Sequence, residues 1–316
     1  MVDISIIFVN FNTAEMTKKA IDLVRKSSHQ LSIEIFVVDN ASKDHSVDLL
    51  VKEFTDITLI SNQTNVGFGR ANNQVLSLVS GRYVLLLNTD AFVQFDTIQK
   101  TYDFMQDNPN IGILGVKLLG RDGVLQPSCR YFPTPWNLFL NRSGFSKYFT
   151  KTRLIDDMDW DHESTRQCDW VPGCYYLVKK EVINKVGLFD PRYFLYYEEV
   201  DHCFAAKLAG WDVAYYAGTS IVHIGGESAK TEGSIANPNR QLIALQIESE
   251  LLYLRKNYGL LSLISHMFLQ NIAGLIMVLK NIIKLRPLAT YCLLINNISL
   301  TWQLFLRTKF GKVATR

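Results

Sequence analysis

Short apolar runs alternate with longer amphipathic segments over residues 1–92. The apolar runs have the length of buried strands and lie at residues 4–10, 33–38, 57–61 and 83–87. The segments between them have the length of helices and lie at residues 14–27, 46–54 and 65–80. Residues able to cap the first two helices precede them: Asn12 or Thr13, and Ser42 or Asp44. This alternation predicts an α/β fold with a doubly wound, mostly parallel sheet and helices on both faces.

Polar residues stand where several of these strands end. The buried run 83–87 stops at Asn88-Thr89-Asp90, the first run stops at Asn10, and the second stops at Asp39. Ligands of open α/β sheets bind beyond the carboxyl ends of the strands. Asp90 is therefore a candidate ligand for a divalent cation that holds a diphosphate, because oxygen ligands suit Mg²⁺ and Mn²⁺. An Asx turn is the structural alternative, since Asn and Asp are common turn residues.

A glycine loop opens the third predicted helix. Gly67-Phe68-Gly69 permits close approach of the backbone at a helix start, where phosphates are favoured. The loop does not have the spacing of GxGxxG, and the chain contains no GxxxxGK[ST]. A dinucleotide-binding dehydrogenase and a P-loop NTPase therefore lose support.

The pattern changes after residue 92. A helix is predicted over residues 95–106, a strand over 111–119, a hairpin turn at 120–123, and further strands at 170–178 and 219–222. Residues 130–169 are rich in aromatic side chains and carry both charge signs. They form either a mobile loop over an acceptor site or small helices with a local core, because a structureless stretch of this length is unusual.

Three carboxylates follow an aromatic run at residues 193–197. On a helix that starts near Tyr197, Glu198 and Asp201 share one face, whereas Glu199 points about 100° away. In the structural interpretation, these acids stabilise the helix start through its dipole. The neighbouring aromatic residues favour a partly dry pocket in which the pKa of a carboxyl group rises, which is the functional one.

Nine segments occur in a characteristic order. They are residues 6–11, 38–42, 65–73, 88–90, 170–173, 187–190, 193–201, 210–211 and 223–226, which read IIFVNF, VDNAS, NVGFGRANN, NTD, WVPG, GLFD, YFLYYEEVD, GW and HIGG. Together they resemble the family-2 glycosyltransferases with a GT-A fold, especially the rhamnosyltransferase-like branch. The resemblance covers roughly residues 1–230, and the ordered set is specific although each piece alone is weak.

The resemblance implies a nucleotide-sugar donor, dTDP- or UDP-linked, a Mg²⁺ or Mn²⁺ ion, and inversion at the anomeric carbon. The donor-binding residues that it implies are Asn10, Asp39, Asn65, Gly67, Arg70, Asn88 and Asp90. The acceptor-binding residues are Trp170, Pro172, Gly173 and Tyr197. The metal ligands are Asp90 and His223, and the catalytic residues are Glu199, Glu198 and Asp201.

Several of these assignments have alternatives or depart from the family pattern. Trp170 is either a stacking platform for a sugar or an ordinary core residue, and a lone histidine such as His223 is usually structural. Asn88 stands where the family has the first Asp of Asp-x-Asp, so it brings no charge. Glu199 is the implied general base, the second acid of the pair, where many relatives have an Asp that is one methylene shorter.

Composition limits the class of protein. Apolar residues make up 48 % of the 316-residue chain, enough for a sizeable core, so global disorder is excluded. The five cysteines include no CxxC pair, which argues against a disulfide framework or a zinc knuckle. This cysteine usage, with a start that has no basic segment or cleavage site, predicts a cytoplasmic protein.

The charge is unevenly divided between body and tail. No Asp or Glu follows Glu250, and the tail from Leu251 holds nine Lys and Arg, so the body carries about −6 and the tail +9. Residues 260–279 and 287–306 are apolar and long enough to span a bilayer, but both contain polar breaks that are costly at its centre. We expect helices that lie in the interface of the cytoplasmic leaflet. A membrane hairpin and a homo-oligomer contact are the alternatives, and the sparse basic residues argue against nucleic acid.

The combined interpretation is a metal-dependent inverting glycosyltransferase at the cytoplasmic face of the membrane. Residues 1–240 form the GT-A domain, with a nucleotide-binding half at 1–92 and an acceptor-binding half at 93–240. Residues 241–316 form a basic, apolar helical region that associates with the membrane. The enzyme would extend a lipid-linked or cell-surface glycan, and the resemblance makes L-rhamnose from dTDP-rhamnose the first candidate donor. A catalytically silent sugar-binding or scaffold protein on the same fold is the alternative.

Overall fold

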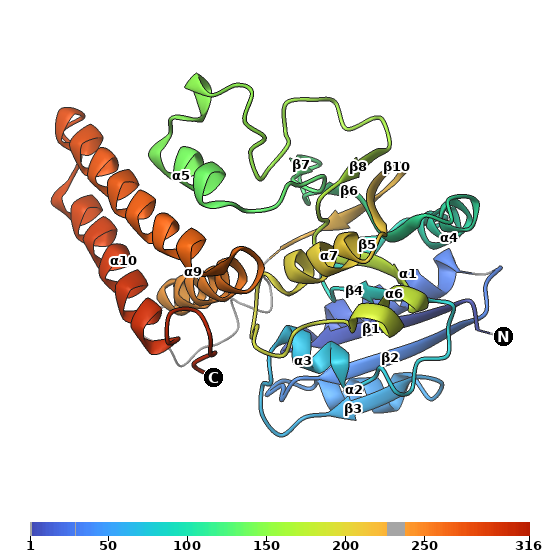
Figure 1. Cartoon of the computed structure of the whole chain (residues 1–316). Coiled ribbons are helices and arrows are strands. Elements are labelled where there is room, and N and C mark those ends of the chain that lie inside the picture. The colour runs from blue at the N-terminus through green and yellow to red at the C-terminus, as the bar shows by residue number, and fades with distance from the viewer. Residues whose placement is uncertain (1, 29, 226–237) are drawn as a thin grey trace.

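A mixed ten-stranded sheet forms the centre of the molecule (Figure 1). The structure, a computed structural model, describes residues 2–28, 30–225 and 238–316. The strands are β1 (Ile4–Asn10), β2 (Ile33–Asp39), β3 (Thr58–Ser61), β4 (Tyr83–Leu87), β5 (Ala91–Val93), β6 (Ile111–Leu119), β7 (Leu125–Gln126), β8 (Arg166–Cys168), β9 (Tyr175–Lys179) and β10 (Asp212–His223).

The strand order is β3-β2-β1-β4-β9-β6-β10-β5, with β7 paired to β6 and β8 paired to β10. Strands β3, β2, β1 and β4 are mutually parallel, which confirms the predicted βαβ units of the first half. Strand β9 runs antiparallel between β4 and β6. The strand predicted from Trp170 is wrong at its start, because β9 begins at Tyr175. Pro172, which has no N–H to give to a ladder, lies in the segment that stays outside the sheet.

The helices cover both faces of the sheet. They are α1 (Ala14–Ser27), α2 (Ser46–Glu53), α3 (Phe68–Asn73), α4 (Thr97–Asp107), α5 (Pro135–Ser143), α6 (Lys180–Val186), α7 (Glu198–Leu208), α9 (Pro238–Ile283) and α10 (Leu288–Arg307), with a short 3₁₀ helix η1 (Ser146–Tyr148). Buried side chains of α1, α2 and α4 share one core with the sheet. Those of α3, α6 and α7 share a second core on the opposite face.

Helix α3 is shorter than the predicted helix at residues 65–80, because it ends at Asn73. Side chains of its last residues bind backbone groups: Asn72 Nδ2 donates to the carbonyl of Phe68 at 2.9 Å, and Asn73 Nδ2 donates to that of Phe189 at 2.7 Å. Asparagine side chains that bond to backbone compete with a continuing helix. The residues that follow form turns instead.

The start of α1 is held by a residue from another loop. The predicted side-chain cap by Asn12 or Thr13 is wrong, because Thr13 Oγ1 donates to Asn10 Oδ1 at 2.8 Å and lies 2.9 Å from Thr89 Oγ1. The N–H of Ala14 donates instead to Asp44 Oδ2 at 3.2 Å. Asp44 Oδ1 also accepts from the N–H of Ser46 at the start of α2. One carboxylate therefore ties two helix starts together at the edge where β1 and β2 end.

Residues 130–169 form small helices with a local core, the second of the two predicted alternatives. Helix α5 begins with a capping box in which Thr134 and Asn137 exchange hydrogen bonds, and it ends at Gly144 in the left-handed conformation. Phe139 and Leu140 of α5 pack against Ala273 of α9. This insert is therefore anchored on the C-terminal region.

The C-terminal region is a helical hairpin at one side of the sheet domain (Figure 1). Gly259, with φ 84° and ψ 179°, interrupts α9 and redirects its second part, which packs along α10. Some polar breaks of the apolar stretches bond between the two helices: Gln270 Nε2 donates to Thr301 Oγ1 at 3.0 Å and Trp302 Nε1 donates to Asn271 Oδ1 at 3.2 Å. Asn296 and Gln303 are exposed. Among the described residues, the part of α9 at 240–283 is long and apolar enough to cross a membrane by length and composition.

Candidate active site

The two predicted metal ligands lie side by side. Strand β5, which the sequence did not predict, pairs antiparallel with the end of β10 and sets His223 opposite Ala91. This register brings His223 Nε2 to 3.6 Å from Asp90 Oδ1. The N–H of Gly225 donates to Asp90 Oδ2 at 3.1 Å, so the carboxylate is held in place, and Gly226 lies outside the described residues.

Gln126 of β7 orients the imidazole of His223 with both ends of its amide. Its Nε2 donates to the carbonyl of His223 at 3.0 Å, which leaves its Oε1 facing His223 Nδ1 at 2.9 Å. Nδ1 therefore carries the proton, and Nε2 presents a lone pair towards Asp90. Burial lowers the pKa of His223 below its ordinary value, which favours the neutral imidazole that metals require.

The chemistry of this pair fits a hard divalent ion. Two neighbouring ligands of an octahedral Mg²⁺ at about 2.1 Å lie about 3 Å apart, close to the 3.6 Å between Asp90 Oδ1 and His223 Nε2. No third His, Cys, Asp or Glu joins them to make a cluster among the described residues. Mg²⁺ commonly keeps several waters and substrate phosphates alongside one or two protein ligands. Asn88, two residues before Asp90, is partly exposed, and its backbone N–H donates to the carbonyl of Cys174.

Asn10 and Asp39 form a single hydrogen-bonded unit at the ends of β1 and β2. Asn10 Nδ2 donates to Asp39 Oδ2 at 2.7 Å, and the N–H of Ser42 donates to Asp39 Oδ1 at 3.0 Å. Asn10 Oδ1 in turn accepts from Thr13 and Thr17. These contacts fix the Asp39 carboxylate at the strand end, and parallel register of Asn10 with Asp39 explains why the two side chains meet.

The glycine loop is shaped by a close backbone contact. Gly67 has φ 89°, and a Cβ built there would lie 2.4 Å from the carbonyl oxygen of Phe194, so a larger residue does not fit. Asn65 Oδ1 accepts from the Gly67 N–H at 3.0 Å. Arg70 Nε donates to the carbonyl of Pro191 at 2.7 Å, and its Nη2 donates to that of Arg316 at 2.9 Å. Arg70 therefore joins the loop to the C-terminal tail.

Two consecutive tyrosines in the left-handed conformation introduce the acidic helix α7. Tyr196 and Tyr197 both have φ 69°, which is unusual for bulky residues and marks a constrained turn. Glu198 is buried beside Gly69, and burial and then Glu199 raise its pKa well above the usual range. Glu199 is partly exposed, and burial raises its pKa against the opposing effect of nearby backbone amides. The Oε2 atoms of both glutamates have no hydrogen-bond partner in the described chain.

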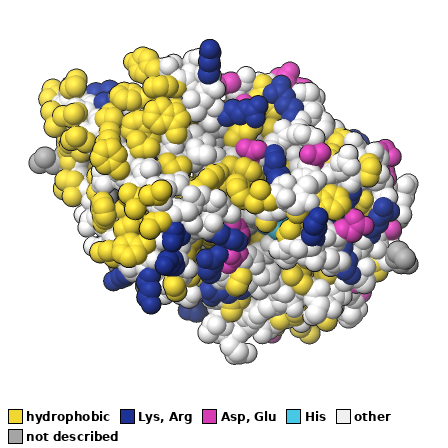
Figure 2. Space-filling view, viewed as in Figure 1, with side chains coloured by type: hydrophobic (Ala, Val, Ile, Leu, Met, Phe, Trp, Pro, Cys, Tyr) yellow, Lys and Arg dark blue, Asp and Glu magenta, His cyan; other side chains and the backbone are white. Residues whose placement is uncertain are grey.

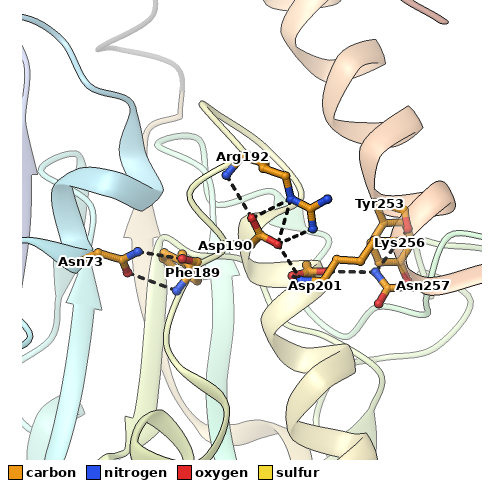
Figure 3. A network of polar contacts seen from close by, with 8 residues as sticks. All are labelled: Asn73, Phe189, Asp190, Arg192, Asp201, Tyr253, Lys256 and Asn257. Atoms are coloured by element: carbon orange, nitrogen blue, oxygen red, sulfur yellow. Dashed lines mark hydrogen bonds and ion pairs between the residues drawn. The ribbon is translucent and has the colours of Figure 1, made fainter. Parts of the chain in front are cut away.

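Asp201 is bound by residues of α9 (Figure 3). Lys256 Nζ of α9 lies 2.6 Å from Asp201 Oδ2, and Asn257 Nδ2 donates to Asp201 Oδ1 at 2.8 Å. Lys256 also donates to Asp190, whose other partner is the guanidinium of Arg192. Hydrogen bonds from Arg192 and Lys256 outweigh burial and hold the pKa of Asp190 below its usual range. Asp201 is thus an anchor between α7 and α9 rather than a free carboxylate.

A second buried ion pair holds the turn before α7. The hydroxyl of Tyr197 donates to Glu250 Oε2 at 2.8 Å, and both Glu250 oxygens accept from Arg142 Nη2 of α5. His266 Nε2 of α9 lies 3.1 Å from Glu250 Oε1. Arg142 and His266 hold the pKa of Glu250 below its usual range despite complete burial. Tyr197, predicted to bind the acceptor, therefore uses its hydroxyl within the fold.

Cys174 lies near Asp90 of the metal-ligand pair and near Glu199 of the acidic helix, and Gly173 also lies near Glu199. Burial raises the pKa of the Cys174 thiol, and the charges of Asp90 and Glu199 raise it further, so both carboxylates are near the thiol. Hydrogen bonding from the Gly173 backbone lowers the pKa of Glu199. Pro172 and Gly173 are partly exposed here.

Trp170, predicted as a stacking platform, is buried. Its indole N–H donates to the carbonyl of Tyr131 at 2.9 Å, and the guanidinium of Arg130 covers its ring at 4.1 Å from the centroid. Arg130 also lies close enough to Glu199 to lower the pKa of that carboxyl group. The packing therefore fits the alternative in which Trp170 is a core residue. Its ring supports the guanidinium of Arg130.

Sequence reasoning missed the residues that hold the site together. They are Gln126, Arg130, Arg142, Glu250 and Lys256. Each lies far along the chain from its partner, and none belongs to a local motif.

Several known proteins are similar to this chain in sequence. The model of the family described as "Glycosyl transferase family 2" matches residues 5–158. An N-acetylglucosaminyl-diphospho-decaprenol L-rhamnosyltransferase of Mycobacterium tuberculosis is 25 % identical over 210 residues, covering 60 % of this chain and 66 % of that protein. The rhamnosyltransferase WbbL of Escherichia coli is 23 % identical over 232 residues, covering 69 % of this chain and 82 % of that protein.

A solved structure shows the same fold over nearly the whole chain. The mannosyltransferase PcManGT from Pyrobaculum calidifontis, solved with GDP-Man and Mn²⁺, superposes with a TM-score of 0.56 at 13 % sequence identity. The match covers 99 % of this chain and 90 % of that one. The sheet is therefore the GT-A type that the sequence motifs predicted.

Proposed function

Residues 5–158 of this chain belong to glycosyl transferase family 2, and on that premise we propose that it is a metal-dependent inverting glycosyltransferase. One arrangement carries the proposal. A carboxylate–imidazole pair, Asp90 with His223, lies near Cys174, and so does Glu199, which has an unpartnered carboxylate oxygen. A diphosphate-binding group and a proton acceptor are the two parts that direct displacement of a nucleoside diphosphate requires.

The residues divide the reaction between them. Asp39, held in place by Asn10, would bind the base or ribose of the donor, and the glycine loop at Gly67 would approach its phosphates. Asp90 and His223 would hold the ion, which would supply Lewis-acid stabilisation of the departing diphosphate. Glu199 takes the proton from the acceptor hydroxyl while that oxygen attacks the anomeric carbon. The nucleoside diphosphate leaves from the opposite face, so the configuration inverts and no covalent intermediate forms.

The relatives suggest the substrate class. Two of them are named as rhamnosyltransferases, and one of these acts on a polyprenyl diphosphate-linked sugar. We therefore infer transfer of L-rhamnose from dTDP-rhamnose to a lipid-linked or cell-surface glycan, in polysaccharide biosynthesis. The active-site residues Glu198, Pro172 and Gly173 would line the acceptor side, next to Glu199.

A panel of nucleotide sugars tests the function. Purified protein with Mg²⁺ or Mn²⁺ is incubated with dTDP-rhamnose, UDP-glucose, UDP-N-acetylglucosamine and GDP-mannose, and release of nucleoside diphosphate is measured. We expect turnover with one nucleotide sugar and loss of that turnover on chelation. Binding of a donor without any turnover across metals and acceptors would favour a silent sugar-binding protein instead.

The tail supports attachment to the inner face of the membrane. Its apolar side chains point outward, as shown by Leu261 and Ile283, which are each 81 % exposed. An apolar hollow of about 490 Å³ opens between α9 and α10 beside Phe268 and Trp302. Together with the absence of acids after Glu250, this surface matches an anionic leaflet, in which apolar side chains enter the interface and cations meet lipid phosphates.

Neutralising two exposed cations of the tail should weaken membrane binding. Arg307→Gln with Lys312→Gln removes two charges worth about 1 kcal/mol each near an anionic surface, so binding to phosphatidylglycerol vesicles should fall about 30-fold. Co-sedimentation at low and high salt measures this. The matched control is Lys52→Gln with Arg121→Gln, which removes the same charge from exposed positions of the catalytic domain. Equal binding of both double variants would contradict the proposal.

A further inference from the structure

The first part of the insert, residues 130–155, has the same charge signature as the tail. It contains no Asp or Glu, and its basic residues are Arg130, Arg142, Lys147, Lys151 and Arg153. Arg130 and Arg142 are used inside the fold, in contacts with Asp156 and Glu250. Lys147, Lys151 and Arg153 are exposed. Within residues 130–155 all the exposed charges are therefore positive, and the acids of the insert begin at Asp156.

Exposed aromatic side chains stand among these cations. Trp136 is 41 % exposed, Tyr148 69 % and Phe149 42 %. The rings of Trp136 and Phe149 meet edge to face with centroids 5.3 Å apart, and Lys147 Nζ lies 4.9 Å from the Tyr148 ring centroid. Tryptophan and tyrosine are the residues that concentrate at membrane interfaces, because each has an apolar ring and a polar end. A group of exposed rings that pack together beside cations therefore has the composition of a membrane-interface contact.

The insert is fixed to the part of the tail that carries the apolar surface. Lys280 Nζ of α9 donates to the carbonyl of Ser143 at 2.7 Å and lies 4.5 Å from the Phe145 ring centroid. Phe139 and Leu140 pack on Ala273 in the same helix. Insert and hairpin are thus packed against each other. Figure 2 shows hydrophobic side chains spread over the α9–α10 hairpin and up to the region of α5 on the same face.

We propose that the insert, from Trp136 to Arg153, is a second membrane contact of this protein and that it binds an anionic bilayer. Its rings lie at the level of the lipid headgroups, and Lys147, Lys151 and Arg153 meet the phosphates. Charge selects this occupant, because a surface that carries only cations attracts an anionic leaflet and repels a second copy of itself. The inference rests on the proposed membrane association of the tail. Two contacts, rather than one, then fix how the catalytic domain is oriented over the membrane.

Vesicle binding of two insert variants tests the proposal. One variant is Trp136→Ser with Tyr148→Ser and Phe149→Ser, and the other is Lys147→Gln with Lys151→Gln. The vesicles contain about 30 % phosphatidylglycerol in phosphatidylcholine. The lysine variant should bind about 30-fold more weakly, and the aromatic variant at least about tenfold more weakly. Circular dichroism and thermal unfolding should be unchanged in the lysine variant, because both lysines are exposed.

The outcomes separate this proposal from the one on which it rests. If the wild-type protein binds vesicles, the tail variant loses binding and both insert variants bind like wild type, the insert makes no membrane contact and only this proposal fails. If the wild-type protein ignores the vesicles, the proposed attachment of the tail fails as well. If light scattering instead shows that the insert variants dissociate an oligomer, the surface is a contact between copies and the proposal is overturned.

Discussion

Replacing Asp90 with asparagine is expected to abolish sugar transfer, by about 10³-fold or more. The substitution keeps the size of the side chain and keeps an oxygen for the Gly225 N–H, which now donates to Asp90 Oδ2 at 3.1 Å. It removes the one charge that the Asn88-Thr89-Asp90 turn offers. Removing even one neutral group that stabilises charge in a transition state costs about 10²–10³-fold. Release of nucleoside diphosphate with the cognate donor measures the effect.

A second acid gives the control for this prediction. Asp48→Asn changes an exposed carboxylate in the first turn of α2 and should leave turnover unchanged. The Asp90→Asn protein should unfold at a similar temperature to the wild type, so that its loss is chemical rather than structural. Near-normal turnover of Asp90→Asn, or wild-type activity that persists with a strong chelator, would contradict the assigned role.

Replacing Glu199 with glutamine is expected to lower turnover by about 10²–10⁴-fold while donor binding persists. The amide has the shape of the carboxylate but cannot accept the acceptor's proton. Glu199 is partly exposed, and its buried Oε2 has no hydrogen-bond partner in the described chain, so this oxygen is not committed to another group. Burial raises its pKa, and a base works only when deprotonated, so wild-type turnover should rise with pH through a value above the ordinary range of glutamate.

The other two acids of α7 distinguish this assignment. Asp201→Asn should chiefly lower thermal stability, because it weakens the contacts of Lys256 and Asn257 that tie α7 to α9. Glu198→Gln should retain measurable turnover, since burial favours the neutral form of Glu198. If Glu199→Gln transfers sugar normally while either of the other variants is inactive but folded, the base is that other residue.

Local pattern was enough for the first half of the fold. Strands β1 to β4 are continuous apolar runs, and α1 begins and ends at the predicted residues because polar residues flank it. The errors arose where a tertiary contact overrides the pattern. Asn73 ends α3 by bonding to the backbone of Phe189, and Pro172 keeps the chain out of β9. The three-residue strand β5 is too short to leave a periodic signal.

The candidate site was likewise predicted where local motifs sufficed and missed where long-range contacts decide. Motifs indicated which residues carry chemistry, and the structure shows Asp90 beside His223 because β5 pairs with β10. The sequence did not predict that Asp201 would be bound by Lys256, 55 residues away, because charge patterns do not encode such long-range pairs. Nor did it predict that Trp170 would be buried under Arg130. The sequence does not distinguish an aromatic residue at the edge of a pocket from one in the core.

A structure of the protein with the nucleoside diphosphate of its donor and Mn²⁺ would test the central claim most directly. The anomalous signal of manganese locates the ion independently of the protein atoms. We predict that the ion lies within about 2.0–2.3 Å of Asp90 Oδ1 and His223 Nε2 and contacts the diphosphate, with Asp39 at the nucleoside. A diphosphate bound without metal near Asp90, or a metal bound elsewhere on the chain, would contradict this account of the active site.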